Sequence, residues 1–211
     1  GRYTCSTTTA PLTMIDVTRT TTALLDGLHQ SGNDTAWAEF DKRYRPILAA
    51  FLCRLGLSEA DGADAAQEAM MQFLTEYRAG RYDRQRGRLR SWLMTIARTK
   101  AAMHYRKKKY ARGESAMDVI EDDAAMTRIW MDERRRALLR EALTRLRQTR
   151  ASDKTIEAFE LLTVRQLTAS AVAEKLQMSV DDVYLAKSRT AKRLRSIVEE
   201  LEHVYDEDPT T

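Results

Sequence analysis

The side chains most suited to chemistry in this sequence are cations mixed with aromatic rings between positions 81 and 112. This stretch holds twelve Lys and Arg residues against one acid, Asp83, a net charge of +11, and it includes Tyr82, Trp92 and Tyr105. Cations neutralise phosphates and aromatic rings stack on unpaired bases, so the mixture is typical of single-strand nucleic-acid binding. Two alternatives remain open: the cations could form a solvated helix face, and Trp92 could belong to a hydrophobic core.

A second candidate nucleic-acid surface lies in residues 168–195. A short apolar helix, a three-residue turn at 177–179 and a longer helix from Val180 follow one another, which is the spacing of a helix-turn-helix. Residues 187–195 carry five positive charges and no acid, which suits a major groove. The alternative is an ordinary helical hairpin with a solvated basic face. Gln177 stands where such turns often have glycine, so it predicts a strained backbone or a looser turn.

Catalytic and metal-binding patterns are not found in the sequence. The three histidines stand in separate segments, and neither an H-E-x-x-H motif nor a Gly-rich phosphate loop occurs. Cys5 and Cys53 lie too far apart in the sequence for a C-x-x-C motif, and this usage fits a reducing cytoplasm. The longest apolar run, 46–53, is far shorter than the roughly 20 residues of a membrane span. We therefore expect a cytoplasmic protein that is not an enzyme and uses no metal, cofactor or membrane.

The elements that position these side chains are predicted to be helices. The 211 residues include only 8 Gly and 3 Pro, and apolar residues recur at three- and four-residue spacing from Thr21 onward. The small, acidic stretch 111–127 is typical of a linker, followed by a helix expected near 128–148. The predicted fold is all-α, with two helical domains joined by this acidic linker and a helix-turn-helix in the second domain. The boundaries are a disordered segment at 1–20, a first domain at 21–110, the linker at 111–127 and a second domain at 128–205.

Three stretches together resemble an extracytoplasmic-function (ECF) sigma factor of bacterial RNA polymerase, in the sigma-70 class. Residues 61–68 (DGADAAQE) resemble the acidic D-A-E-D-x-x-Q-E core-binding segment of that family. Residues 82–98, continuing to 104–108, resemble its Y-D-x-x-R-G-x-x-x-x-W-L-x-x-I-A-R promoter-melting segment. Residues 168–195 resemble its C-terminal helix-turn-helix. The likeness covers roughly residues 22–203.

The resemblance implies an alternative sigma factor that binds RNA polymerase core and directs promoter-specific transcription initiation. Residues 21–110 would form sigma domain 2, and residues 128–205 would form sigma domain 4 near the β flap. The residues implied to contact the β-prime clamp helices are Asp61, Asp64, Gln67 and Glu68. Those implied to bind minus-ten promoter DNA are Arg88, Arg90, Trp92, Arg98, Lys100, His104, Tyr105, Arg106, Lys107 and Lys108. Those implied to bind the minus-thirty-five element are Ser179, Asp182, Tyr184, Lys187, Ser188, Arg189 and Lys192.

The acidic segment departs from the family pattern. Asp61-Gly62-Ala63-Asp64 carries two acids where the family has three, so weaker binding to the polymerase core is expected. One ECF subgroup with depleted acids is activated by a Ser/Thr kinase, which makes Ser58, at a predicted helix N-terminus, a candidate phosphosite. The alternative is that Ser58 is a plain N-cap. An anti-sigma factor is the other implied regulatory partner.

A stand-alone helix-turn-helix repressor is the main alternative function. That reading leaves residues 61–68 and the basic-aromatic run without a role. The two functions differ in core dependence: a sigma factor starts RNA synthesis only with polymerase core, whereas a repressor binds its duplex alone.

Overall fold

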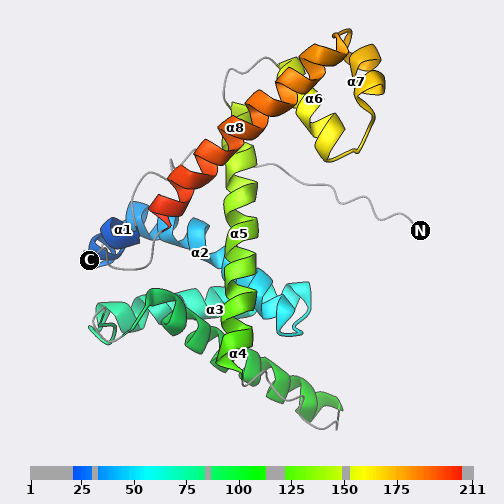
Figure 1. The fold of residues 1–211 in the computed structure, drawn as a ribbon. Helices are drawn as coiled ribbons and strands as arrows, with labels where there is room; N and C mark the ends of the chain where they lie inside the picture. The colour runs from blue at the N-terminus through cyan, green and yellow to red at the C-terminus, as the bar shows by residue number, and fades with distance from the viewer. Residues whose placement is uncertain (1–20, 30–32, 84–86, 113–121, 149–152, 206–211) are drawn as a thin grey trace.

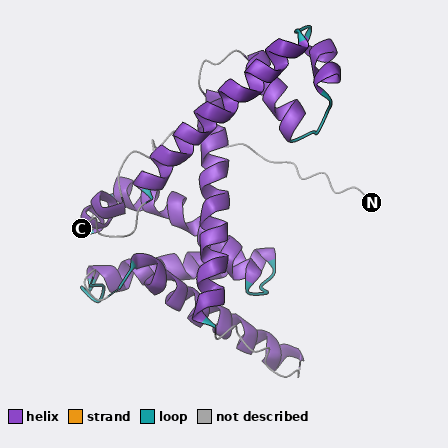
Figure 2. Cartoon of the chain, viewed as in Figure 1, coloured by secondary structure: helices purple, strands orange, loops and turns teal. Residues whose placement is uncertain are grey.

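Helices joined by loops, without a strand, make up the described part of the protein, which confirms the all-α prediction (Figures 1 and 2). The computed structural model describes residues 21–29, 33–83, 87–112, 122–148 and 153–205. These contain the helices α1 (Thr21–Leu28), α2 (Asp34–Arg54), α3 (Glu59–Arg78), α4 (Leu89–Arg112), α5 (Asp123–Gln148), α6 (Asp153–Thr163), α7 (Ala169–Leu176) and α8 (Val180–Val204). Over these ranges, no helix combines the length and apolarity that a membrane span requires. The segment 1–20, predicted to be disordered, lies outside the described residues.

Local sequence signals set the ends of the first helices. Asn33 caps α2, its Oδ1 accepting a hydrogen bond from the Ala36 backbone N–H at 3.1 Å. Gly56 has a φ of 103° and follows the end of α2, a conformation that L-residues with a side chain rarely adopt. The chain therefore turns sharply between α2 and α3, and the two helices pack against each other.

The main hydrophobic core is built around α2. This helix packs against α1, α3, α4 and α5, and its residues Phe40, Tyr44 and Phe51 are completely buried. Phe40 stacks on Phe73 of α3 with ring centroids 4.8 Å apart. Aromatic pairs of this kind add to the free energy gained from burying apolar area. The arrangement holds α3 and α4, which carry two of the three predicted site segments, on one rigid support.

Helix α5 is longer than expected, and it crosses from α4 toward α8 (Figure 1). Helices extend into both ends of the expected linker 111–127, because α4 ends at Arg112 and α5 begins at Asp123, and its role as a linker stays a prediction. The early start has a local cause: the Asp122 carboxylate accepts a hydrogen bond from the Ala124 N–H at 2.8 Å, as an N-cap does. Residues 113–121, which carry part of the predicted linker, lie outside the described residues.

The last three helices share a second, smaller core. Buried Leu161, Val172 and Val183 bring α6, α7 and the first turns of α8 together. The other end of α8 joins the main core, where Ile197 and Leu201 are buried with residues of α1 to α5. Helix α8 therefore connects two hydrophobic clusters. The division of the chain into two domains stays a prediction.

Candidate functional sites

The four predicted polymerase-binding residues lie together on α3. Asp64, Gln67 and Glu68 are exposed, and Asp61 is half-buried at the start of the same strip. Positions three, four and seven apart share one face of a helix, which is why the spacing in the sequence gathers them. The structure thus brings the predicted set onto one surface, while its role stays a prediction.

The N-terminus of α3 is capped by Ser58. Its Oγ accepts a hydrogen bond from the Asp61 N–H at 3.3 Å and also contacts the Asp61 carboxylate. Ser58 is therefore an N-cap, as one of the two alternatives had it, and it is exposed. Its position at the N-terminus of α3 favours added negative charge through the helix dipole, whereas the neighbouring Asp61 carboxylate disfavours it. Whether Ser58 is phosphorylated stays a prediction.

The glycine in the acidic segment has a packing role. A Cβ at Gly62 would lie 2.7 Å from the Sγ of Cys53 and 3.3 Å from the backbone oxygen of Ala49. Only glycine lets α2 and α3 approach this closely without displacing Cys53. Burial raises the pKa of the Cys53 thiol, and the Glu59 and Glu133 carboxylates raise it further, as expected for a packing residue rather than a reactive one. The packing against Cys53 therefore explains the glycine at position 62, and it does not explain the missing acid, which falls at Ala63.

Cations of α4 face the acids of α3 across a groove of about 870 Å³. Lys100 Nζ lies 3.5 Å from Glu68 Oε2, and Lys100 is only 16% exposed. His104 places Nε2 3.8 Å from Glu68 Oε1 and Nδ1 4.0 Å from Asp61 Oδ1. Residues predicted to meet polymerase and residues predicted to meet DNA are thus neighbours. Sequence spacing does not predict this pairing, because it joins residues of two different helices.

An aromatic pair lines a smaller cavity at the start of α4. Tyr82 and Trp92 stack with ring centroids 4.8 Å apart and planes 5° apart, and the edge of Trp92 meets Phe73. The cavity, about 250 Å³, is also lined by Arg88. Trp92 is half-buried against the main core and also reaches this cavity. It is therefore in part a core residue, and its role in binding DNA stays a prediction. Tyr82 was not among the predicted site residues, although its place in the basic-aromatic run was the available signal.

The remaining predicted residues of α4 have different surroundings. Tyr105 donates a hydrogen bond from its hydroxyl to the Leu55 carbonyl at 2.6 Å, which anchors α4 to the end of α2. Arg98 Nη1 lies 3.9 Å from Asp123 Oδ1 at the start of α5. Arg88 and Arg106 are exposed and Arg90 is half-buried. The side chains of Lys107 and Lys108 lie outside the described residues.

The turn between α7 and α8 contains the predicted strain. Gln177 adopts a left-handed conformation, φ 53° and ψ 52°, and the Met178 N–H reaches back to the Ala173 carbonyl at 2.9 Å. Ser179 then caps α8: its Oγ accepts from the Asp182 N–H at 3.0 Å and contacts the Asp182 carboxylate at 2.7 Å. These bonds explain how α8 starts at Val180 despite the strained residue before it.

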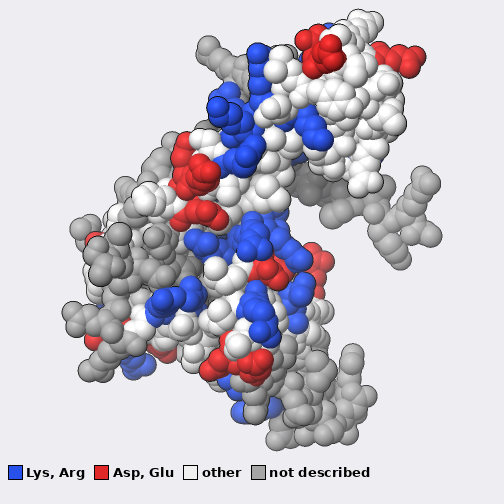
Figure 3. All heavy atoms as spheres, in the orientation of Figure 1, with Lys and Arg blue, Asp and Glu red and all other residues white. Residues whose placement is uncertain are grey.

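The outward face of α8 is cationic and open to solvent. Tyr184 is 55% exposed, and Lys187, Ser188, Arg189 and Lys192 are exposed as well. Within the described ranges, no ion pair involves these cations. Figure 3 shows Lys and Arg side chains along the middle of α8, with acidic ones near its start and toward its C-terminal end.

Part of this chain matches a known protein family. Residues 40–111 match the family described as Sigma-70 region 2, a range that runs from Phe40 in α2 through α3 and nearly all of α4. A search of curated proteins found no significant match. The matched range holds the acidic strip, the facing cations and the aromatic cavity. The chain therefore carries a sigma-70 region 2 domain, which supports a sigma-70 family factor and implies a role in binding RNA polymerase.

Proposed function

We propose that this protein is a sigma factor of the ECF type that directs promoter-specific transcription initiation by RNA polymerase. The observation that carries the proposal is the position of the basic-aromatic surface of α4 inside the sigma-70 region 2 match. Stacked aromatic rings beside arginines suit a strand whose bases are unpaired. The protein acts in the cytoplasm as a binding factor, without a catalytic site, metal or cofactor of its own.

Each part of the protein has a proposed partner. The strip of half-buried Asp61 and exposed Asp64, Gln67 and Glu68 binds the β-prime clamp helices, while α4 holds minus-ten DNA. The α7–α8 pair acts as a helix-turn-helix on the minus-thirty-five element near the β flap. Its support is the capped start of α8 and the open cationic face behind it. An α-helix fits the major groove, and cations spaced along it reach flanking phosphates.

Run-off transcription from genomic fragments tests the proposal. Purified polymerase core with this protein is expected to start RNA at defined promoters, whereas core alone or protein alone makes none. Footprinting of the same fragments should show protection only when core is present. Tight, sequence-specific duplex binding by the free protein, with no transcription when core is added, would instead identify a stand-alone repressor.

Phosphorylation of Ser58 is the proposed form of regulation, with an anti-sigma factor as the alternative regulator. The Asp61–Asp64 segment has fewer acids than its family pattern, and a phosphate at Ser58 would add negative charge next to it. The test compares Ser58→Ala with Ser58→Asn, because asparagine keeps the N-cap and lacks the hydroxyl that a kinase modifies. Both variants should lose kinase-dependent transcription. Full activity of Ser58→Asn with the kinase would show that the residue matters only as a cap.

A further inference from the structure

The first two turns of α8 expose an apolar patch. Val180 is 40% exposed, Tyr184 is 55% exposed and Leu185 is 45% exposed. Nine large hydrophobic side chains are exposed among the described residues, and these three fall within six positions of one another. A single exposed apolar side chain is ordinary on a protein surface, whereas a contiguous group is typical of an interaction site. We call Val180, Tyr184 and Leu185 the α8 apolar patch.

The patch lies on the side of α8 that faces away from its neighbouring helices. Val183, on the opposite side of the same turns, is completely buried with residues of α6 and α7. Tyr184 follows Val180 by four positions, and positions four apart are neighbours on a helix surface. Leu185 follows Asp181 by the same spacing, and Asp181 is exposed as well. The outward surface of these turns is therefore apolar, with the Asp181 carboxylate beside it.

The charge of α8 changes sign just after the patch. Its first turn carries Asp181 and Asp182, whereas residues 187–195 hold five exposed cations and no acid. A DNA duplex carries its phosphates along the rims of the major groove and presents its base edges on the floor. Phosphates attract the cations and repel the two carboxylates. The charges therefore favour a duplex whose phosphates lie along residues 187–195 and whose base edges face the α8 apolar patch.

The C5-methyl of thymine is the apolar group that a base edge presents in the major groove. Polar side chains read guanine and adenine through hydrogen bonds, but the side chains of Val180 and Leu185 have no donor or acceptor. An aliphatic side chain packed on a thymine methyl removes that methyl from water. Burial of one such group is worth about fourfold in affinity. The patch thus matches thymine better than it matches the other bases.

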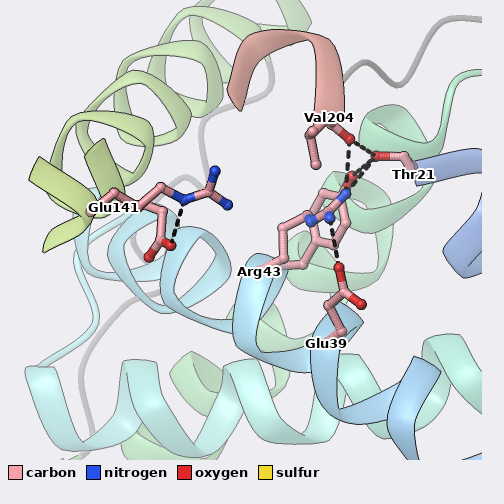
Figure 4. A network of polar contacts seen from close by, with 7 residues as sticks. Thr21, Glu39, Arg43, Glu141 and Val204 are labelled. Atoms are coloured by element: carbon pink, nitrogen blue, oxygen red, sulfur yellow. Dashed lines mark hydrogen bonds and ion pairs between the residues drawn. The ribbon is translucent and has the colours of Figure 1, made fainter. Parts of the chain in front are cut away.

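The far end of α8 is fixed by a buried arginine, which holds the patch on a rigid element. Arg43 of α2 is 1% exposed and donates from Nη1 to the Val204 carbonyl at 2.9 Å (Figure 4). Its charge is balanced by Glu39, whose Oε1 lies 3.3 Å from Nη2. Base recognition requires side chains that are held in place by the scaffold. A helix anchored in this way meets that requirement better than a loop does.

We propose that the α8 apolar patch selects duplex sites by contact with thymine C5-methyl groups in the major groove, with Leu185 as the main specificity-determining residue. The proposal rests on the proposed function for a DNA-binding surface at α7–α8. It adds two aliphatic side chains, Val180 and Leu185, to that surface, whereas the side chains implied there by the sigma-factor resemblance are polar. Thymine is expected at the positions of the site that face the patch.

Replacement of thymine by deoxyuridine tests the proposal, because the two bases differ only in the methyl group. Sites are enriched from a random duplex pool on the full-length protein, alone and with polymerase core, and each enriched duplex is remade with deoxyuridine. Fluorescence anisotropy should show about fourfold weaker binding for each contacted thymine that loses its methyl. Leu185→Ala should bind the two duplexes nearly equally. Leu139→Ala, at a leucine of α5 that is also 45% exposed, should keep the full preference.

The outcomes separate methyl readout from the proposed function. Equal binding of both duplexes by the unmodified protein would overturn methyl readout, as would an unchanged preference in Leu185→Ala or a pool that yields no sequence. A dimer in sedimentation that is lost in Leu185→Ala would instead assign the patch to a second copy of the chain. If methyl preference is absent while run-off transcription succeeds, only this inference falls. A methyl preference without core-dependent transcription would overturn the sigma-factor function and leave readout by Leu185 standing.

Discussion

The surfaces of α3–α4 and α7–α8 both carry the charges expected of nucleic-acid or polymerase contacts. On the first surface opposite charges are paired with each other, whereas on the second the cations are unpaired within the part of the chain that the structure describes. On α3–α4, Lys100 lies against Glu68, so these two opposite charges partly neutralise each other, and His104 lies near Glu68 and Asp61. On α8, Lys187 and its neighbours face solvent, with no ion pair among the described residues. A partner of the first surface must therefore compete with internal pairs, whereas a partner of the second meets open cations.

The two regions also differ in glycine content: α3 has a glycine inside the helix, and the α7–α8 turn has none at its left-handed position. The α3 segment has Gly62 inside a helix, where alanine is the better helix former, because Cys53 occupies the space. The α7–α8 turn has Gln177 in a left-handed conformation, where glycine is the better fit. In the first region packing overrides helix propensity, and in the second a side chain is kept at the cost of backbone strain. Four variants, the first a double substitution, test these contrasts.

The largest effect is expected from reversing charge on the open surface. The double variant Lys187→Glu and Arg189→Glu should reduce transcription from a promoter with a defined minus-thirty-five element by about a hundredfold, because each lost contact is worth about 1–3 kcal/mol. Run-off assays with polymerase core measure this change. Arg135→Glu alters charge on the exposed face of α5 and serves as the control, with activity close to that of the unmodified protein. Equal losses in both variants would mean that the α8 surface has no special role.

Gly62→Ala should lower the free energy of unfolding by about 1–3 kcal/mol, because the added methyl overlaps Cys53. Urea denaturation gives this value. Adding Cys53→Ala removes the overlapping sulfur, so the double variant should recover most of the loss. A Gly62→Ala protein as stable as the parent would show that α2 and α3 can separate slightly at no cost.

Gln177→Gly should have the opposite effect on the free energy of unfolding. Removing the side chain relieves the left-handed strain and should raise the stability by about 0.5–1 kcal/mol, after the greater flexibility of glycine in the unfolded chain is counted. Gln166 is also left-handed, with φ 54°, so Gln166→Gly is a matched variant in a loop. Thermal unfolding of the two proteins measures the gains. A drop in stability for Gln177→Gly would indicate that its side chain makes a stabilising contact.

The smallest effect is expected on the paired surface. Glu68→Gln removes one partner of Lys100 and His104, and it should strengthen binding of a single-stranded oligonucleotide to the free protein about twofold to threefold. Fluorescence anisotropy at low salt detects a change of this size. Glu157→Gln, at an exposed site on α6, changes the net charge equally and should have less effect. An equal gain in both would assign the effect to net charge instead of local pairing.

The helices and their caps could be predicted from the sequence, since they depend on neighbours in the chain. The apolar spacing of α2 and the hydroxyl cap at Ser58 are both local signals. The pairing of Lys100 with Glu68 and the burial of Arg43 depend on how helices meet, which spacing alone does not reveal. Arg43 sits in a stretch with other charges, where a surface position is the ordinary expectation. The early start of α5 had a local signal in Asp122, but the acidic composition around it favoured a linker.

Helix α8 is continuous from its cap at Ser179 to the turn at Tyr205, and this continuity makes it a lever arm. Its 25 residues extend about 37 Å from the Arg43–Val204 hydrogen bond to Val180. A tilt of about 10° at the Val204 end would move Val180 by about 6 Å. Small repacking around the buried Arg43 would thus be amplified at the α7–α8 turn.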